Sequence, residues 1–341
     1  MDYEIFEKYS KEREPTKYEK CYAWKTAIGL QEVDALKPSS YLIETAKSNI
    51  EGDITLEEAK KLIHTYYNKK SEREAKTEEA DKVSVRIATL LSEKSFSFSP
   101  IQYLSIHKSL FEGIYSHAGK IRDYNISKEE WVLNGDTVIY GNAFDLSETL
   151  EYDLEKEKKF DYKDLSIDDM IKHLSRFASD LWQIHVFGEG NTRTTAVFLI
   201  KYLNKLGFDV TNDTFEKHSW YFRNALVRAN YNNVSKGIYE TTYYLELFFR
   251  NLLLNENNEL SNRKMNISYK NIEEKDESIE INQNEKDILN ILKENAKLTL
   301  EEVSVKIGKS LRTVKSIIKS LTIKKKIERV GSKKSGYWKV L

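Results

Sequence analysis

Apolar residues recur every three to four positions over most of this chain, which is the spacing of amphipathic helices. The pattern is clearest in five stretches, at residues 84–93, 99–115, 166–185, 192–208 and 220–254. Only 13 glycines and 3 prolines punctuate the 341 residues, too few for the many turns of an all-β protein. The pattern therefore predicts a mostly α fold.

One segment departs from the helical period. Residues 130–141 alternate apolar and polar side chains around Asn134-Gly135, a dipeptide typical of two-residue hairpin turns. The sequence therefore predicts a β-hairpin in a helical domain, where it has no sheet to join. Such a hairpin is either a surface loop or an element that pairs with an extended ligand.

The chain divides into four regions. Residues 1–80 are helical and highly charged, with Thr55 as the expected N-cap of one helix. Residues 81–255 hold the longest helical patterns, and 256–283 form a polar stretch that is typical of a linker. Residues 284–341 contain 15 Lys and Arg against 6 Asp and Glu, a net of +9. Since the whole chain is neutral, a basic module follows an acidic body.

Composition bears on the compartment. The single cysteine, Cys21, excludes an internal disulfide and a cysteine-based zinc site. The charged first residues are not a signal peptide, and the chain contains no apolar run of membrane-spanning length. We expect a soluble, cytoplasmic protein with no membrane partner.

The candidate catalytic and phosphate-binding residues lie close together between Trp182 and Arg193. Gly188 and Gly190 interrupt two strongly helical stretches, so one helix ends near His185 and another begins near Asn191 or Thr192. The first N–H groups of a helix bind anions. An acid–base group (His185), a ligand for a hard metal (Glu189) and a guanidinium (Arg193) accompany them. Each alone is more often structural, but together they favour phosphate chemistry with Mg²⁺.

The same run resembles the Fic motif, His-x-Phe-x-(Asp/Glu)-Gly-Asn-x-Arg-x-x-Arg. Six positions match at the right spacing, namely His185, Phe187, Glu189, Gly190, Asn191 and Arg193. There are two departures: Val186 replaces the usual proline, and Ala196 replaces the second arginine, which in the family contacts the nucleotide's γ-phosphate.

The resemblance implies a helical Fic-fold core that transfers AMP from ATP to a Ser, Thr or Tyr hydroxyl of a protein target or of itself. His185 would be the general base, and Glu189 would hold Mg²⁺ on the phosphates. The phosphate cradle would comprise Gly188, Gly190, Asn191, Thr192 and Arg193, while Phe187 would pack inward.

Neighbouring segments fit the same family. The predicted hairpin lies where Fic enzymes have a flap that registers an extended target segment, which implies target contacts from Val138, Ile139, Tyr140 and Gly141. Gly119 and Arg122 resemble the Gly-x-x-Arg that precedes the flap. Residues 220–230 resemble the helix lining the adenosine pocket, with Tyr221, Phe222 and Asn230 as candidates. Arg223 or Arg228 is a hypothetical substitute for the missing arginine.

The N-terminal region resembles the small antitoxin-like domain that restrains many Fic proteins through a glutamate. Aligned without gaps, the inhibitory positions hold Leu30, Asp34 and Ala35. Asp34 is one methylene shorter than glutamate, and its expected partner is Ala196. We therefore expect no tight lock; alternatively, residues 1–80 only cap the core.

The C-terminal segment reads as three helices and a basic hairpin, and it looks like a winged helix-turn-helix. Thr299 and Glu302 form an expected capping box. DNA contacts are predicted from the second helix of the motif and from the wing, while a protein-binding winged helix is the alternative. The predicted DNA-binding residues are Arg312, Thr313, Ser316, Lys319, Lys333 and Lys334.

These expectations define a protein adenylyltransferase that uses ATP and Mg²⁺, with a protein target and with DNA as a second partner. A nucleotide-sensing DNA-binding regulator with little catalysis is the first alternative. A Fic enzyme that uses another nucleotide donor, or removes AMP, is the second. The sequence also leaves open that the protein forms a homodimer.

Overall fold

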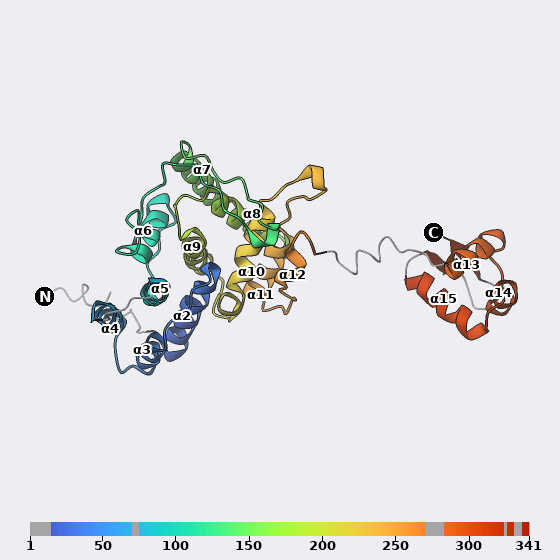
Figure 1. Cartoon of the computed structure of the whole chain (residues 1–341), viewed down its shortest axis with the longest axis horizontal. Coiled ribbons are helices and arrows are strands. Elements are labelled where there is room, and N and C mark those ends of the chain that lie inside the picture. The colour runs from blue at the N-terminus through green and yellow to red at the C-terminus, as the bar shows by residue number, and fades with distance from the viewer. Residues whose placement is uncertain (1–14, 70–74, 270–282, 324–325, 331–335, 341) are drawn as a thin grey trace. The chain divides into compact units, whose positions relative to one another are not determined.

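The structure is a computed structural model that describes residues 15–69, 75–269, 283–323, 326–330 and 336–340. It divides into two compact units, Met1–Tyr269 and Lys270–Leu341, and helices predominate in both, as the sequence predicts (Figure 1). Within those ranges no helix has the length and apolarity needed to cross a membrane.

The described part of the first unit begins with four short helices: α2 (Lys17–Gly29), η1 (Leu30–Asp34), α3 (Ser40–Glu51) and α4 (Leu56–Lys69). Side-chain oxygens cap the three α-helices, since Thr16, Ser39 and Thr55 each accept a hydrogen bond from a main-chain N–H three residues on. The expected N-cap at Thr55 is thereby confirmed.

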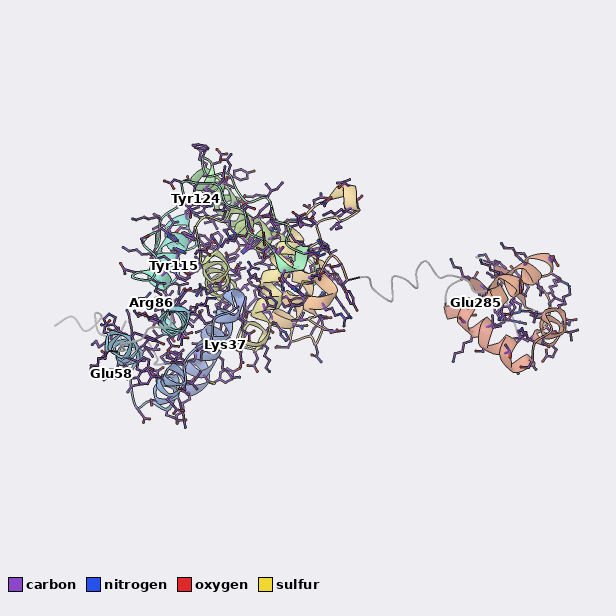
Figure 2. All side chains as sticks on the ribbon, viewed as in Figure 1. Lys37, Glu58, Arg86, Tyr115, Tyr124 and Glu285 are labelled. Atoms are coloured by element: carbon purple, nitrogen blue, oxygen red, sulfur yellow. The ribbon has the colours of Figure 1, made fainter. Side chains whose placement is uncertain are left out.

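The rest of the first unit is built around α9. Its principal helices are α5 (Ala75–Ser92), α6 (Pro100–Phe111), α7 (Leu146–Lys158), α8 (Ile167–Ile184), α9 (Asn191–Lys205), α10 (Thr214–Ala229) and α11 (Tyr243–Leu254). The first thirteen residues of α9 are all buried, and side chains fill the space between it and the surrounding helices (Figure 2). A helix buried on every side must lie at the centre of its domain.

The N-terminal helices share the core of this unit. Residues of α2, α3 and α4 belong to the same apolar cluster as those of α5 to α11. At the crossing of α2 with α10, a Cβ added to Gly29 would lie 2.4 Å from the carbonyl oxygen of Glu216. Only glycine allows this approach, and Ser219 Oγ donates a 2.6 Å hydrogen bond to the Gly29 carbonyl there.

Part of the predicted linker is folded. Residues 256–269 belong to the first unit and include the short helix α12 (Asn262–Met265), whose Met265 is buried. The polar composition misleads because asparagine side chains bond the main chain: Asn251 Nδ2 donates to the Asn258 carbonyl at 2.9 Å. The remainder of the predicted linker, 270–282, lies outside the described residues.

The prediction of a β-hairpin at 130–141 is wrong, because neither arm forms a strand. The chain does turn at Asn134-Gly135, but it does so after a 3₁₀ turn, η2 (Trp131–Leu133), and no ladder joins the two arms. A lone two-stranded hairpin is marginal in water. Here the Glu130 N–H donates to the Asp136 carbonyl at 3.0 Å across the turn, and the segment also bonds other parts of the unit: Ile267 N–H, for example, donates to the Val132 carbonyl at 3.0 Å.

The second unit has the predicted order of elements: α13 (Gln283–Glu294), α14 (Leu300–Ile307), α15 (Leu311–Ile323), β1 (Ile327–Val330) and β2 (Tyr337–Val340). The strands pair antiparallel, with Ile327 opposite Val340. The Thr299–Glu302 capping box is confirmed. Ten buried apolar residues, from Ile288 to Trp338, form a core of its own.

Candidate functional site

The sharp turn between α8 and α9 places His185. The residue ends α8 in the left-handed conformation, with φ 51° and ψ 57°, and α9 begins six residues later at Asn191, as predicted. We call residues 185–191 the motif loop. Gly190 has φ 75°, and an added Cβ would lie 2.4 Å from the Phe111 ring, so no other residue fits there.

The motif loop is braced from inside. Asn191 Oδ1 accepts from the Phe187 N–H at 3.0 Å, and its Nδ2 donates to the Phe187 carbonyl at 2.7 Å. Phe187 is fully buried and packs inward, as the resemblance implies. Asn191 therefore shapes the cradle with its side chain, and any contact with an anion would come from its main chain.

A neutral histidine supports the loop from α6. His107 is stacked on Phe187, with ring centroids 3.6 Å apart. Its Nδ1 accepts from the Gly119 N–H at 2.8 Å, so its Nε2 carries the proton that it shares with the Glu189 carbonyl at 3.0 Å. Burial lowers the pKa of His107 to about 4, which keeps this arrangement intact at neutral pH.

Arg122 ties three segments together. Its Nε donates to the His185 carbonyl at 2.8 Å, and its two Nη atoms donate to the carbonyls of Tyr124 and Gly141. The Arg122 N–H also reaches the Val186 carbonyl at 3.0 Å. Because the side chain is only 5% exposed and its contacts are main-chain carbonyls, Arg122 positions the loop and does not bind ligand.

The imidazole of His185 lies in a pocket of aromatic rings. Its centroid is 4.2 Å from that of Tyr140 and 5.2 Å from that of Trp182, which meets it edge-on. Nδ1 is buried and has no hydrogen-bond partner in the described parts of the chain. Burial, reinforced by nearby Lys128, holds the pKa of His185 well below its usual range, so the ring is neutral at physiological pH.

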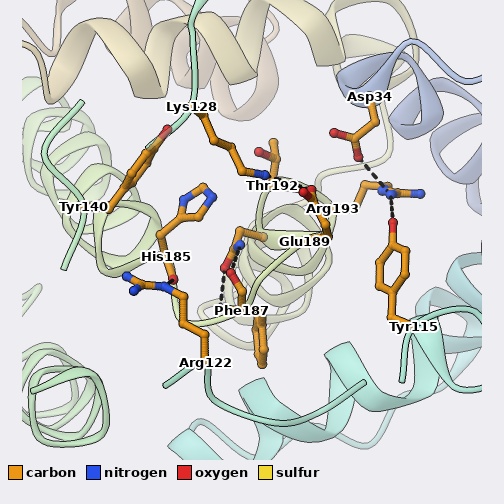
Figure 3. A network of polar contacts seen from close by, with 12 residues as sticks. Asp34, Tyr115, Arg122, Lys128, Tyr140, His185, Phe187, Glu189, Thr192 and Arg193 are labelled. Carbon is orange, nitrogen blue, oxygen red and sulfur yellow. Dashed lines mark hydrogen bonds and ion pairs between the residues drawn. The ribbon is translucent and has the colours of Figure 1, made fainter. Parts of the chain in front are cut away.

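Glu189 points to the other side of the motif loop and pairs with Lys128 at 2.8 Å (Figure 3). Its side chain is 54% exposed. Nowhere in the described ranges do three His, Cys, Asp or Glu residues gather as a metal cage. A single accessible carboxylate is nonetheless what Mg²⁺ uses when substrate phosphates and waters complete its coordination. Glu189 fits that role, and it would have to part from Lys128 to fill it.

The structure overturns the expectation that Asp34 has no arginine to hold. Asp34 Oδ2 lies 2.9 Å from Nη2 of Arg193, the first motif arginine (Figure 3). Glu79 Oε1 lies 2.6 Å from the same nitrogen, and Gln31 Oε1 accepts from Nη1 at 3.1 Å. Burial opposes the charge of Arg193, but Asp34 and Glu79 outweigh it and raise its pKa.

Position 196, where the motif has its second arginine, holds an alanine. Ala196 is fully buried, three residues after Arg193 and hence on the same side of α9. Asp34, at the end of η1, therefore pairs with the first motif arginine. Arg193 is only 1% exposed and lies against Asp34, Glu79 and Gln31.

The flap residues keep the predicted alternation without forming strands. Val138 and Tyr140 are buried, whereas Ile139 is 83% exposed. Main-chain contacts fix this segment to the end of α8: Gln183 Nε2 donates to the Ile139 carbonyl at 3.0 Å, and the Gly141 N–H donates to the Gln183 carbonyl at 3.2 Å.

The predicted nucleotide-binding residues Tyr221, Asn230 and Thr192 make hydrogen bonds within the protein. Tyr221 is buried and its hydroxyl donates to the Tyr244 carbonyl, while Asn230 Nδ2 donates to the carbonyls of Ser179 and Leu226. Thr192, at the start of α9, accepts from Trp182 Nε1 at 3.0 Å. None of these four hydrogen bonds points to nucleotide binding.

The two proposed substitutes for the missing arginine both lie on α10. Arg223 pairs with Glu130, a fully buried acid that also accepts from the Tyr140 hydroxyl. Arg228 is buried as well, and its Nε and Nη1 have no hydrogen-bond partner among the residues described.

The predicted DNA-binding face is partly visible. Thr313, Ser316 and Lys319 lie exposed on one side of α15, opposite the buried Val314 and Ile318. The Arg312 side chain, Lys333 and Lys334 lie outside what the structure describes.

Sequence patterns missed three residues that surround the motif. His107 lies on the apolar face of α6, where Tyr103 and Phe111 flank it at helical spacing, so a histidine at a core position was the available signal. Lys128 and Glu79 lie in charged stretches and carry no such signal, because their partners come from distant segments.

Comparisons with known proteins agree with the motif. Residues 97–203 match the model of the Fic/DOC family, and residues 281–322 match that of a winged helix-turn-helix DNA-binding domain. The structure is similar, at a TM-score of 0.43, to that of a Fic family protein from Desulfovibrio desulfuricans G20, with 11% identity over 99% of this chain and 91% of the other. No curated protein matches the sequence significantly.

The motif loop, its aromatic support and the match over residues 97–203 thus agree: the chain contains a Fic/DOC family domain, followed by a winged helix-turn-helix domain.

Proposed function

We propose that this protein transfers AMP from ATP to a Ser, Thr or Tyr hydroxyl of a protein target or of itself. Its domain belongs to a family that generally transfers nucleotidyl groups to proteins. The observation that carries the proposal is the placement of His185. Its imidazole is buried and neutral, and it is followed within six residues by the accessible carboxylate of Glu189 and by the N-terminus of α9.

The reaction uses each of these groups. The target oxygen attacks the α-phosphorus as His185 takes its proton, and the bond from that phosphorus to the β-phosphate oxygen breaks to release pyrophosphate. Mg²⁺ bound by Glu189 would neutralise phosphate charge. Main-chain N–H groups at the start of α9 support the negative oxygens, helped by the helix dipole.

The adenine ring of ATP has a candidate binding pocket beside the N-terminal helices. A pocket of about 690 Å³ lies between η1 and α10, and its walls include Ile28, Ala35 and Trp220. Volumes of this order suit nucleotides, and an indole face suits a purine. The pocket adjoins the segment that carries Asp34, since Glu32 and Ala35 line it.

Isotopic position tests the proposal directly. The purified protein, alone and in a cell extract, is incubated with ATP labelled at either the α- or the γ-phosphate, and then with the other nucleoside triphosphates. Protein should retain the α label and lose the γ label. Retention of only γ label would mean phosphorylation, and transfer from another triphosphate alone would replace ATP as the donor. No transfer from any of them would leave the nucleotide-sensing regulator.

Removing Asp34 should strengthen nucleotide binding. In Asp34→Ala, Arg193 loses one of its two carboxylate partners, and phosphates compete with the remaining acid only. Because the Asp34 side chain is about one-third exposed, we expect a modest gain, a roughly threefold to tenfold lower Kd for ATP by calorimetry. Glu44→Ala removes an exposed acid from α3 as the matched control. An unchanged or higher Kd in Asp34→Ala would show that this ion pair does not restrain the site.

We also propose that the second domain binds DNA through the exposed face of α15. Lys319→Ala and Ser316→Ala should weaken binding to duplex DNA, and the lysine variant should also lower the salt dependence, since phosphate contacts release counterions. A fluorescence-anisotropy titration over a range of salt concentrations measures both. Val305→Ala, on the exposed side of α14, is the control. Equal affinity in all variants would favour a protein partner.

A further inference from the structure

The cations around His185 differ in how firmly they are held. Arg122 is saturated by main-chain carbonyls, and Arg223 is held by the fully buried Glu130. Arg193 is itself buried between Asp34 and Glu79. The fourth cation, Lys128, is a quarter exposed, and its carboxylate partner is Glu189.

The partner of Lys128 is therefore the group that Mg²⁺ would claim. A carboxylate oxygen that binds Mg²⁺ closely cannot keep an ammonium at 2.8 Å on the same oxygen without strong repulsion between the two cations. If Mg²⁺ took Glu189, the ammonium of Lys128 would lose its ion-pair partner next to the residue that would hold the metal.

The position of Lys128 limits how far the freed ammonium can move. Its N–H donates to Thr137 Oγ1 at 3.2 Å across the base of the flap, so the main chain is fixed there. Figure 3 shows the Lys128 side chain extending toward Glu189, with Tyr140 and His185 on its other side. Four flexible methylenes let the ammonium swing from Glu189 to a neighbouring oxygen without any movement of the backbone.

We propose that Lys128 is a phosphate-binding residue that is released by metal binding at Glu189 and that supplies, from the segment just before the flap, a positive charge that α9 lacks at Ala196. This inference rests on the proposed nucleotide chemistry. It makes Lys128 a ligand for the polyphosphate of the donor and gives Glu189 a second task, that of holding Lys128 until metal and nucleotide arrive together.

A double-mutant cycle without metal tests the release. Binding of the non-reactive α,β-methylene analogue of ATP is measured by calorimetry in EDTA for wild type, Lys128→Met, Glu189→Gln and the double variant. In wild type Lys128 is held, so Lys128→Met should change the Kd less than about twofold. In the Glu189→Gln background Lys128 is free, so the same change should raise the Kd about tenfold.

A metal titration gives a second readout of opposite sign. With Mn²⁺ alone, followed by the electron paramagnetic resonance signal of the free ion, Lys128→Met should bind more tightly than wild type because Glu189 has lost a competing cation. With Mn²⁺ and the analogue together, Lys128→Met should bind the analogue about tenfold more weakly than wild type. Lys120→Met removes an exposed lysine from the same connecting segment and should match wild type in both titrations.

The outcomes separate two failures. If wild type binds the analogue with metal but Lys128→Met binds it equally well, the role of Lys128 is refuted and the proposed function stands. If wild type binds no analogue under any condition, both are refuted. Thermal unfolding should be the same in wild type and Lys128→Met, because a part-exposed ion pair adds little stability.

Discussion

Replacing Arg122 with methionine should lower the free energy of unfolding of the first unit by about 3–5 kcal/mol. Arg122 is 5% exposed, and its guanidinium donates to carbonyls of the motif loop, the flap and the segment just before the flap. Methionine fills similar space but donates no hydrogen bond. The carbonyls of Tyr124, Gly141 and His185 would then be buried without that partner, and each carries a desolvation cost.

Chemical denaturation of the full chain, followed by far-UV circular dichroism, measures this loss. Arg176→Met is the matched control, because that arginine is exposed and its only ion pair in the described residues spans 3.8 Å to Glu240. It should cost less than about 0.5 kcal/mol. Arg122→Lys should recover little, since one ammonium cannot reach carbonyls arranged for a planar fork. A loss below about 1 kcal/mol in Arg122→Met would mean that water replaces the guanidinium.

The motif loop could be predicted from the sequence because its signals are local. Gly188 and Gly190 interrupt two helical periods, and the structure ends α8 at Ile184 and begins α9 at Asn191. The positive φ of Gly190 and the closeness of Phe111 give physical reasons for that glycine. The winged helix was predictable in the same way, since caps and turns such as Thr299 and Gly308 are decided within a few residues.

The pairing of side chains in the site could not be predicted, because it depends on contacts between residues far apart in the sequence. Asp34 and Arg193 are separated by most of the N-terminal half of the chain, and helical periodicity does not determine which acid a buried arginine meets. The expectation of no tight lock followed from two substitutions, the shorter Asp34 and Ala196. It overlooked Arg193, a different arginine of the same helix, with which Asp34 pairs.

The flap shows how a correct local signal can give a wrong element. Asn134-Gly135 does turn the chain, with Asn134 in the left-handed conformation that such turns require. Strand pairing needs both arms to prefer each other, yet Gln183 and the segment around Ile267 offer the flap main chain other partners. Those partners follow from the tertiary fold and are invisible in the alternation of side chains.

Replacing His185 with alanine should reduce nucleotidyl transfer by a factor of about 10² to 10⁴, the usual contribution of a positioned general base. Burial keeps the pKa of His185 below its ordinary value of about 6.5, so the ring stays in its basic form at neutral pH. The wild-type rate should therefore stay level from pH 8 to about 6.5 and fall only at lower pH, as the imidazole gains its proton.

Initial rates of α-label transfer across this pH range test both statements at once. In His185→Ala the small remaining rate should lack the acid limb, because the group that titrates is gone. His64→Ala, which removes an exposed histidine from α4, should reproduce the wild-type rate and profile. A residual rate above about one-tenth of wild type would remove His185 from the role of base. An acid limb centred above pH 6.5 would show that the rate is controlled by the proton of another, less buried group. Burial lowers the pKa of a histidine, so His185 cannot titrate there.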